Sequence, residues 1–423
     1  MALPLAVPES FENHEHWSAV KDVCHRLSES GHRALLAGGC VRDLLMGRVP
    51  NDFDVATDAT PDQVLALWPG AIMVGKAFGV SILPFAGFQV EVATFRQDLE
   101  YRDGRRPVGV RFSTPEEDAK RRDFTVNALF FDLETNEVLD FVGGRGDLAR
   151  KCLRTVGTPE LRFNEDKLRI LRAVRFAAQL GFEIETKTLE AIVRLGHDVT
   201  QVSRERVRDE LFKLLKAPKR ERGLKLLLDT RLLDAIFPAL AREVRAQGEQ
   251  KWLARLAKIG ASESLASFIA SLAAFFAPEL GGAAPAKAIS TALKSLKLDN
   301  HLVESVTFVL RSEATLNAPG SLRLGELLLL LFHPEASAAR AFAAAGQGAS
   351  AEATHELDRI TRRFVDANGG KLPPAFLSGD DAKAHGQKPG PEMGRLLHEG
   401  FLLQLEGKFA DRAAALDWLK SQL

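Results

Sequence analysis

Two aspartates separated by one residue are the clearest candidates for chemistry in this chain. Asp52 and Asp54 lie in the run Asn51-Asp52-Phe53-Asp54. On a β-strand, side chains two residues apart share a face, so the two carboxylates project together while Phe53 faces the core. Neighbouring carboxylates repel each other unless a cation neutralises them, and Mg²⁺ binds carboxylate and triphosphate oxygens together. The pair therefore predicts a magnesium site for phosphoryl transfer, although this pattern alone also fits two solvated loop aspartates.

A third carboxylate lies on a later predicted strand. In residues 88–92, alternation places Val90 and Val92 on one face and Glu91 on the other. Glu91 can approach the aspartate pair across neighbouring strands, which makes it a further candidate metal ligand. The alternative is an ordinary surface residue of a strand.

A glycine turn precedes the aspartates. Gly38 and Gly39 stand between a predicted strand, residues 33–37, and a predicted helix beginning at Val41. Backbone N–H groups at such a turn, together with the positive end of the helix, cradle phosphates. Arg42, on the first helical turn, can add charge-assisted hydrogen bonds. A Gly-Gly pair alone is typical of any turn, but this one would place a triphosphate beside the metal.

The segment 161–180 predicts a helix that carries a second set of polar residues. Asp166, Arg169 and Arg172 follow at i, i+3 and i+6 along one side, and Arg175 continues the stripe. Cytosine and adenine present an amino donor beside a ring-nitrogen acceptor, which match Asp166 and Arg169, whereas uracil and guanine present the opposite groups. The pair is thus predicted to accept C and A and to reject U and G. The alternative is an ion-pair network on a solvated face.

Further charged residues indicate nucleic-acid binding. Arg122 can contact a nucleotide, and Asp123 can accept a hydrogen bond from a ribose 2′-hydroxyl. The alternative for Asp123 is a helix cap. The basic clusters 145–154 and 204–222 are candidate contacts to phosphate backbones or, alternatively, solvated faces.

Composition narrows the class of protein. The chain has 423 residues and equal numbers of basic and acidic residues, 56 each, so a nucleic-acid site must be a local patch. Three cysteines without CxxC spacing argue against a disulfide framework or a zinc site and fit a cytoplasmic location. Residues 1–15 lack a signal-peptide pattern, and the longest apolar runs, such as residues 327–332, are too short to cross a bilayer.

Strand and helix signals divide the chain into two parts. Up to about residue 157 they alternate, which predicts an α+β domain with a mixed sheet, and afterwards they are all helical. The predicted strands are 33–37, 53–56, 75–85 and 89–95, with a hairpin of 129–132 and 138–141. The predicted helices are 16–30, 161–180, 188–195, 204–216 and 220–228, with more helices to the C-terminus.

Six runs, in order along residues 36–215, carry a family resemblance. They resemble the class II tRNA nucleotidyltransferases (CCA-adding enzymes) and bacterial poly(A) polymerases, within the DNA polymerase β superfamily. The runs are LAGGCVRDLLMGRVPNDFDVAT, FRQDLEYRDGRRPVGVRF, RRDFTVNALFFD, DFVGGRGDL, EDKLRILRAVRFAAQLGF and VSRERVRDELFKLL.

The resemblance implies an architecture and a set of roles. It implies a polymerase-β-like nucleotidyltransferase head at residues 1–157, followed by an all-α neck at 158–217, body at 218–300 and tRNA-binding tail at 301–423. Residues 96–110 match the flexible loop that supports the switch from C to A addition. Asp52 and Asp54 match the magnesium ligands, and Gly39 and Arg42 match triphosphate contacts. The nucleotide-contacting positions of the family fall on Arg122, Asp123, Asp166, Arg169, Arg172 and Arg175, with Asp123 selecting ribose.

The implied activity is CCA addition: transfer of C and A from CTP and ATP to the 3′ end of tRNA without a nucleic-acid template. The tRNA 3′-hydroxyl is then the nucleophile, so no covalent enzyme intermediate is expected. No membrane and no protein partner are implied. Alternatives are an A-only or CC-only tRNA enzyme, a poly(A) polymerase acting on mRNA, and a non-catalytic RNA-binding scaffold. Residues 74–80 lack the basic Gly-Arg-Arg-Phe type stretch of the poly(A) branch, which favours tRNA.

Overall fold

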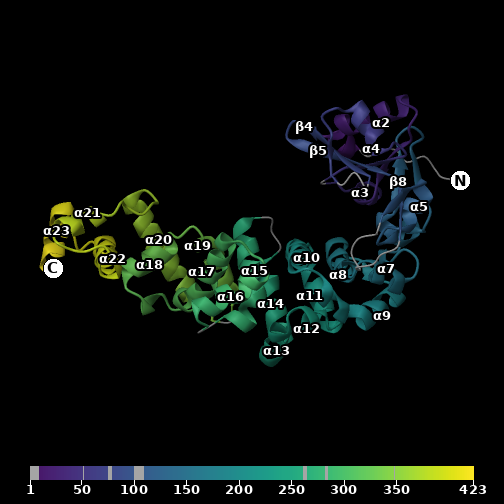
Figure 1. The fold of residues 1–423 in the computed structure, drawn as a ribbon. Helices are drawn as coiled ribbons and strands as arrows, with labels where there is room; N and C mark the ends of the chain where they lie inside the picture. The colour runs from purple at the N-terminus through teal and green to yellow at the C-terminus, as the bar shows by residue number, and fades with distance from the viewer. Residues whose placement is uncertain are drawn as a thin grey trace. The chain divides into compact units, whose positions relative to one another are not determined.

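The structure is a computed structural model that describes residues 9–50, 52–74, 79–99, 109–260, 264–281, 284–346 and 348–423. It divides into two compact units, Met1–Pro238 and Ala239–Leu423, whose elements are labelled in Figure 1. The boundary between the units lies inside the region predicted as the body. The finer division into head, neck, body and tail stays a prediction.

A seven-stranded mixed sheet forms the framework of the N-terminal unit. Its strand order is β3-β4-β5-β2-β1-β8-β9, with β2 and β5 parallel and the other neighbouring pairs antiparallel. The mixed sheet and the β8–β9 hairpin are therefore confirmed. The strands are β1 (Ala34–Ala37), β2 (Asp54–Thr57), β3 (Ile72–Met73), β4 (Val80–Phe85), β5 (Phe88–Thr94), β8 (Leu129–Asp132) and β9 (Glu137–Asp140).

Helices and two small sheets complete this unit. β6 (Arg96–Asp98) pairs with β7 (Val110–Phe112), and β10 (Cys152–Leu153) pairs with β11 (Glu183–Ile184). The helices are α1 (Glu9–Glu12), α2 (Trp17–Glu29), α3 (Gly39–Leu45), α4 (Pro61–Leu67), α5 (Pro115–Lys120), α6 (Gly144–Ala149), α7 (Pro159–Glu165), α8 (Leu168–Leu180), α9 (Thr186–Leu195), α10 (Arg204–Lys216), α11 (Arg220–Asp229) and α12 (Leu232–Ile236), with 3₁₀ turns η2 (Thr125–Asn127) and η3 (Gly196–Gln201).

The pleat of β1 supplies apolar side chains to two cores. Leu36 belongs to a core that also holds buried residues of α2, α3 and α4, so these helices cover one face of the sheet. Leu35 and Ala37 belong to a second core on the opposite face, with Ala119 of α5 and Phe130 of β8. Burial of both faces explains why the central strands are short continuous apolar runs.

The C-terminal unit consists of helices in the part that the structure describes. α15 is buried along most of its length, including Phe268, Leu272 and Phe275, and packs against α17 and α19. Within the described residues no single helix is long and apolar enough to cross a membrane, while the bent pair α18 and α19 meets the length and composition criteria together. The helices are α13 (Pro238–Gln247), α14 (Glu249–Ile259), α15 (Leu265–Leu280), α16 (Ala286–Ser295), α17 (Asn300–Asn317), α18 (Leu324–Leu331), α19 (Ala336–Ala345), α20 (Ala351–Asn368), α21 (Gly379–Ala384), α22 (Pro391–Leu405) and α23 (Arg412–Ser421), with the 3₁₀ turn η4 (Pro319–Ser321).

The helix predicted over 161–180 is in fact two helices. α7 ends at Glu165 and α8 begins at Leu168, so Asp166 lies between them with φ −147° and ψ 106°. The Asp166 carboxylate accepts a hydrogen bond from the N–H of Leu168, the first residue of α8, at 3.0 Å, which is a local turn contact just before the helix. The polar stripe expected on one continuous helix therefore begins at Arg169.

Other element boundaries also differ from prediction. The expectation that strands end at residue 157 is wrong, because β11 pairs in parallel with β10. Two-residue strands carry no periodic signal by which a sequence would reveal them. The loop predicted at 96–110 is paired at its ends as β6 and β7, and its residues 100–108 lie outside the described residues. The strand predicted at 75–85 is described from Val80 onward, and the helix expected from Val41 begins at Gly39.

Two glycines of α6 should respond differently to alanine. A Cβ at Gly144 would lie 2.2 Å from the backbone oxygen of Thr125, whereas at Gly146 the nearest atom is 3.4 Å away, in the movable Arg150 guanidinium. Gly144→Ala must push α6 away from η2, and we expect it to lower the free energy of unfolding by about 1–3 kcal/mol. Urea unfolding should show little change in the free energy of unfolding for Gly146→Ala. Equal losses for the two variants would contradict the close packing of Gly144 against Thr125.

Candidate active site

A cavity of about 460 Å³ in the N-terminal unit gathers most of the predicted site residues. Ala37 and Ala56 belong both to its wall and to the second core, so it opens on that face of the sheet. Asp52 and Arg175 are not among its lining residues. The predicted site residues that line the cavity are Gly38, Gly39, Arg42, Asp54, Glu91, Arg122, Asp123, Asp166, Arg169 and Arg172.

The glycine turn fits tightly into one end of the cavity. Gly38 has φ 77°, a conformation that favours glycine, and its N–H donates to the Leu129 oxygen at 3.0 Å. A Cβ at Gly38 would lie 2.8 Å from Nη1 of Arg122 and 4.0 Å from Oδ2 of Asp54. The backbone at Gly38 therefore approaches both a guanidinium and a carboxylate of the site, and a side chain there would displace Arg122.

Arg42 is held from two sides rather than projecting freely. Its Nε and Nη2 donate to the two carboxylate oxygens of Asp43 at 3.0 and 2.9 Å, and its Nη1 donates to Oδ1 of Asn127 at 2.7 Å. Only 4% of the residue is exposed. Because its direction is already fixed by these partners, Arg42 supplies a preorganised positive charge at the cavity wall.

Asp54 faces a second carboxylate across the sheet. It is the first residue of β2, and the parallel register places it opposite Glu91 of β5. Burial, the charge of Glu91 and the charge of Asp52 raise the pKa of Asp54 to about 6, and the Arg122 guanidinium partly opposes them. This crowding of negative charge is the environment that a divalent cation neutralises.

The described side chains nevertheless do not complete a set of metal ligands. Within the described residues, no three His, Cys, Asp or Glu side chains converge to hold a metal ion. Asp52 precedes β2, and Asp52, Asp54 and Glu91 all reach solvent at the cavity, although the surrounding protein atoms desolvate the Asp54 carboxylate. A cation bound here would thus need ligands from a substrate, as Mg²⁺ at triphosphate sites usually has. Direct ligation by Glu91 stays a prediction.

Asp123 forms the centre of a buried polar network. Its Oδ2 accepts from Nε and Nη2 of Arg172 at 2.9 and 2.6 Å, and its Oδ1 accepts from the N–H of Phe124 and from Asn127. Burial alone would raise the pKa of Asp123, but Arg172 outweighs it and lowers the pKa to about 2. Asp123 is therefore ionised and joins η2 to α8.

The predicted base-reading residues have separate partners. Both oxygens of Asp166 accept from Arg206 of α10, at 3.1 and 2.6 Å. Arg169 donates to Glu165 at 2.5 Å and to two backbone oxygens. Arg175 is buried, and its Nε donates to Glu210 at 2.6 Å. It therefore supports the packing of α8 against α10 instead of facing the cavity.

Three polar residues of this site were missed from the sequence. Asn127 joins Arg42 to Asp123, and Asp118, which is 2% exposed, holds Arg121 and Arg122 through ion pairs of 2.7 and 3.1 Å. Arg206 was only one member of the predicted basic cluster 204–222. Its i,i+4 relation to the buried Glu210 was the available signal that it faces the interior.

Two segments of the chain match models of known protein families. The model of the poly A polymerase head domain matches residues 34–154, and the model of a probable RNA and SrmB-binding site of polymerase A matches residues 181–243. A CCA-adding enzyme of Bacillus pumilus is 45% identical over 222 residues, covering 52% of this chain and 55% of that enzyme. Poly(A) polymerase I of Escherichia coli is 40% identical over 238 residues, covering 54% of this chain and 51% of that protein.

The agreement in structure extends over the whole chain. A crystal structure of the Bacillus stearothermophilus CCA-adding enzyme in complex with CTP has a TM-score of 0.78 at 29% identity and covers 98% of both chains. The chain is thus similar to CCA-adding enzymes and bacterial poly(A) polymerases, and it carries matches to a head-domain model and an RNA-binding model of these polymerases. In sequence it spans about half the length of the family members from Bacillus pumilus and Escherichia coli. Asp166, Arg169 and Arg172 fall between the two segments that the family models match.

The raised pKa of Asp54 predicts a pH dependence of the stability of this protein. The pKa rises from 3.8 to about 6, so the folded protein binds a proton that the unfolded chain releases. The free energy of unfolding without divalent cations should therefore fall as the pH rises from about 4 to about 6, and then level off.

Asp54→Asn should remove that part of the pH dependence. The variant should gain stability relative to the wild type between pH 4 and pH 7, measured by thermal unfolding in EDTA. Asp22→Asn, at an exposed position of α2, is the matched control. A constant difference between Asp54→Asn and the wild type across this range would contradict the assignment.

Proposed function

We propose that this protein is a tRNA nucleotidyltransferase that adds the C and A residues of the CCA end from CTP and ATP, without a nucleic-acid template. The observation that carries the proposal is the single cavity lined by the glycine turn, by Asp54 with Glu91, and by Asp166 with Arg169. The relatives support it, because CCA-adding enzymes match both the sequence of about half the chain and the fold of nearly all of it. A cytoplasmic location accords with this activity.

The reaction we propose is an attack of the tRNA 3′-hydroxyl oxygen on the α-phosphorus of the nucleotide. A P–O bond forms to the RNA, the bond to pyrophosphate breaks, and the hydroxyl proton is released. Asp52 and Asp54 would hold Mg²⁺, which neutralises triphosphate charge and lowers the pKa of the hydroxyl. The turn at Gly38 leaves room for the triphosphate close to the carboxylates. Arg42 and Arg122, each fixed by its own partners, stabilise the negative charge of the phosphates.

Selection of the nucleotide would use the opposite wall. Asp166 accepts from the amino group of C or A, and Arg169 donates to the neighbouring ring nitrogen. Asp123 is ionised, and Arg172, Phe124 and Asn127 already fill its four acceptor positions. A ribose 2′-hydroxyl would therefore have to replace one of these donors to bind the carboxylate. Arg172 and Arg175 would act by fixing Asp123 and α10, respectively.

Proteins similar to this chain define the rival functions. Poly(A) addition is the first, because poly(A) polymerase I is 40% identical over the matched region. A-only and CC-only tRNA enzymes would share the same cavity, and a non-catalytic scaffold would bind RNA without extending it. Products formed on a defined RNA distinguish all four.

The decisive experiment uses a tRNA that lacks its CCA end, with Mg²⁺ and with CTP, ATP or both. We expect CCA when both nucleotides are present, CC with CTP alone, and no long A tract with ATP. Asp54→Ala should lower incorporation by at least about 10³-fold without lowering the unfolding temperature, because the charge that binds the cation is lost. Asp22→Ala is the control with an equal change of charge.

Each alternative product would identify a different one of the rival functions. A long A tract on arbitrary RNA would favour the poly(A) polymerase, and CC alone or A alone would identify a divided activity. RNA binding without any nucleotide incorporation would favour the non-catalytic RNA-binding scaffold.

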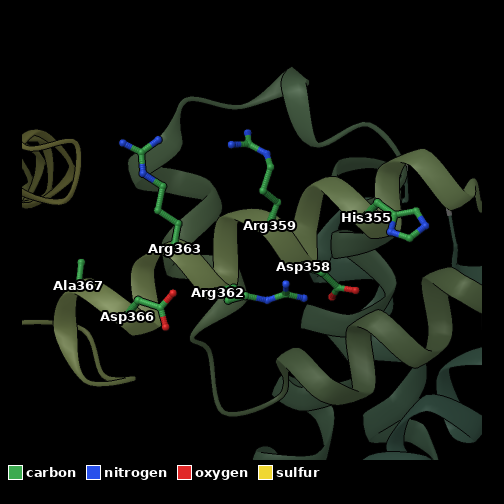
Figure 2. Close-up of a pocket in the computed structure, with 7 residues that line it drawn as sticks. All are labelled: His355, Asp358, Arg359, Arg362, Arg363, Asp366 and Ala367. Carbon is green, nitrogen blue, oxygen red and sulfur yellow. The ribbon is translucent and has the colours of Figure 1, made fainter.

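We further propose that α20 in the C-terminal unit contacts RNA phosphates, in line with the predicted tRNA-binding tail. Residues of this helix, among them His355, Arg359, Arg362 and Arg363, line a hollow of about 640 Å³. Figure 2 shows their side chains projecting from α20. Arg359 pairs with Glu356, and Asp358 pairs with Arg340 of α19. Arg362 and Arg363 are exposed and make no hydrogen bond or ion pair within the described residues. These two guanidinium groups are therefore available to phosphate.

Salt dependence tests this surface. The double variant Arg362→Ala/Arg363→Ala should weaken tRNA binding and reduce the slope of log K against log salt by about 1–2, since each lost phosphate contact removes about 0.7–0.9. The control is Lys383→Ala/Lys420→Ala, which removes two cations that Asp380 and Asp417 already neutralise. Equal slopes for the two double variants would contradict a specific contact at α20.

A further inference from the structure

Asp166 lies outside both neighbouring helices, and its backbone contacts to Arg162 and Arg169 do not set the rotation of its side chain. It occupies the break between α7 and α8, with an extended backbone, and 17% of its side chain is exposed. Its own contact to the N–H of Leu168 fixes only Oδ1. A carboxylate that must distinguish an amino donor from a carbonyl has to be fixed in both position and rotation, because a turned carboxylate would meet the base at a different angle.

Arg206 supplies the missing restraint. It lies in the first turn of α10 and reaches Asp166 with both terminal nitrogens, Nη1 to Oδ1 at 3.1 Å and Nη2 to Oδ2 at 2.6 Å. This planar two-point contact fixes the plane of the carboxylate, which a lysine at the same position would not do. Both side chains are largely shielded from solvent, and Arg206 lines the cavity.

The contacts leave free hydrogen-bonding positions on both reading residues for a base. A carboxylate has about four acceptor positions; Leu168 and Arg206 take two on Oδ1, and Arg206 takes one on Oδ2. Arg169 has five N–H groups, of which three are engaged by Glu165 and the oxygens of Arg162 and Arg121. One acceptor position on Asp166 and two donors on Arg169 therefore remain.

We propose that Arg206 is a positioning residue for base choice, which acts by fixing the plane of the Asp166 carboxylate so that its remaining acceptor position faces the nucleotide. This inference rests on the proposed function of the cavity. It assigns part of the specificity to α10, forty residues beyond Asp166 in the chain. Arg206 itself forms no bond to the reacting atoms.

The packing of α10 does not depend on this contact. Val207, Leu211, Leu214 and Leu215 are buried along the helix, and Arg175 pairs with Glu210 beneath it. Substitution of Arg206 should therefore leave the fold in place, and a change in nucleotide choice can be separated from a change in stability.

The test measures kcat/KM for CTP, ATP, UTP and GTP on a tRNA that lacks its CCA end. Arg206→Ala should lower the preference for CTP over UTP by at least about tenfold, because loss of one charge-assisted hydrogen bond has about that effect. Arg206→Lys should give an intermediate preference, since it keeps the charge without the two-point contact. The control is Arg194→Ala, which breaks an ion pair between α9 and Glu160 of α7 away from the cavity.

A double-mutant cycle shows whether Arg206 acts through Asp166. If it does, Arg206→Ala/Asp166→Ala should have the same nucleotide preference as Asp166→Ala alone. Additive losses, or an Arg206→Ala variant that keeps the wild-type preference, would overturn the proposal. If the wild type incorporates no nucleotide, the proposed function fails, and equilibrium dialysis of CTP and UTP with the wild type and Arg206→Ala still tests the role of Arg206.

Discussion

The repulsion between the carboxylates of Asp54, at the start of β2, and Glu91, within β5, is the constraint on which the rest of the site depends. Parallel pairing places Asp54 opposite Glu91, and the sheet core on both faces prevents the two strands from moving apart. The folded chain therefore keeps negative charge close together at a cost in stability, and a cation can relieve that cost. This arrangement makes cation binding and the stability of the pairing between β2 and β5 interdependent.

The arginine side chains around these two carboxylates are held in position mainly by other acidic residues. Asp43 and Asn127 hold Arg42, Asp118 holds Arg122, Asp123 holds Arg172, and Asp166 holds Arg206. Each guanidinium has its direction fixed before any ligand arrives, so little rearrangement is needed when phosphates bind. The equal numbers of acidic and basic residues in the chain agree with this internal pairing.

The sequence predicted those parts of the site that follow from local periodicity. Alternation along strands placed Glu91 on the face away from Val90 and Val92, and the structure brings it opposite Asp54. Gly38 and Gly39 were expected at a turn beside the acids, and the close approach of Arg122 to Gly38 explains why glycine is needed there. Arg206 could not be paired with Asp166 in advance, because helix packing between distant segments leaves no local pattern. The break at Asp166 was missed because one local side-chain turn contact interrupted an otherwise continuous apolar period.

The interruption between α7 and α8 also determines how changes in chain length would be absorbed. A residue inserted within α8 before Arg169 would rotate the following side chains by about 100° and carry Arg172 away from Asp123. A residue inserted at Asp166 or Lys167 meets no continuous helical hydrogen-bond ladder, so α8 could keep its rotational setting while α7 shifts along its own axis. Because an insertion at Lys167 would also change the spacing between Asp166 and Arg169, length variation in homologues should collect on the α7 side of Asp166, where the register of one helix is already separate from that of the next.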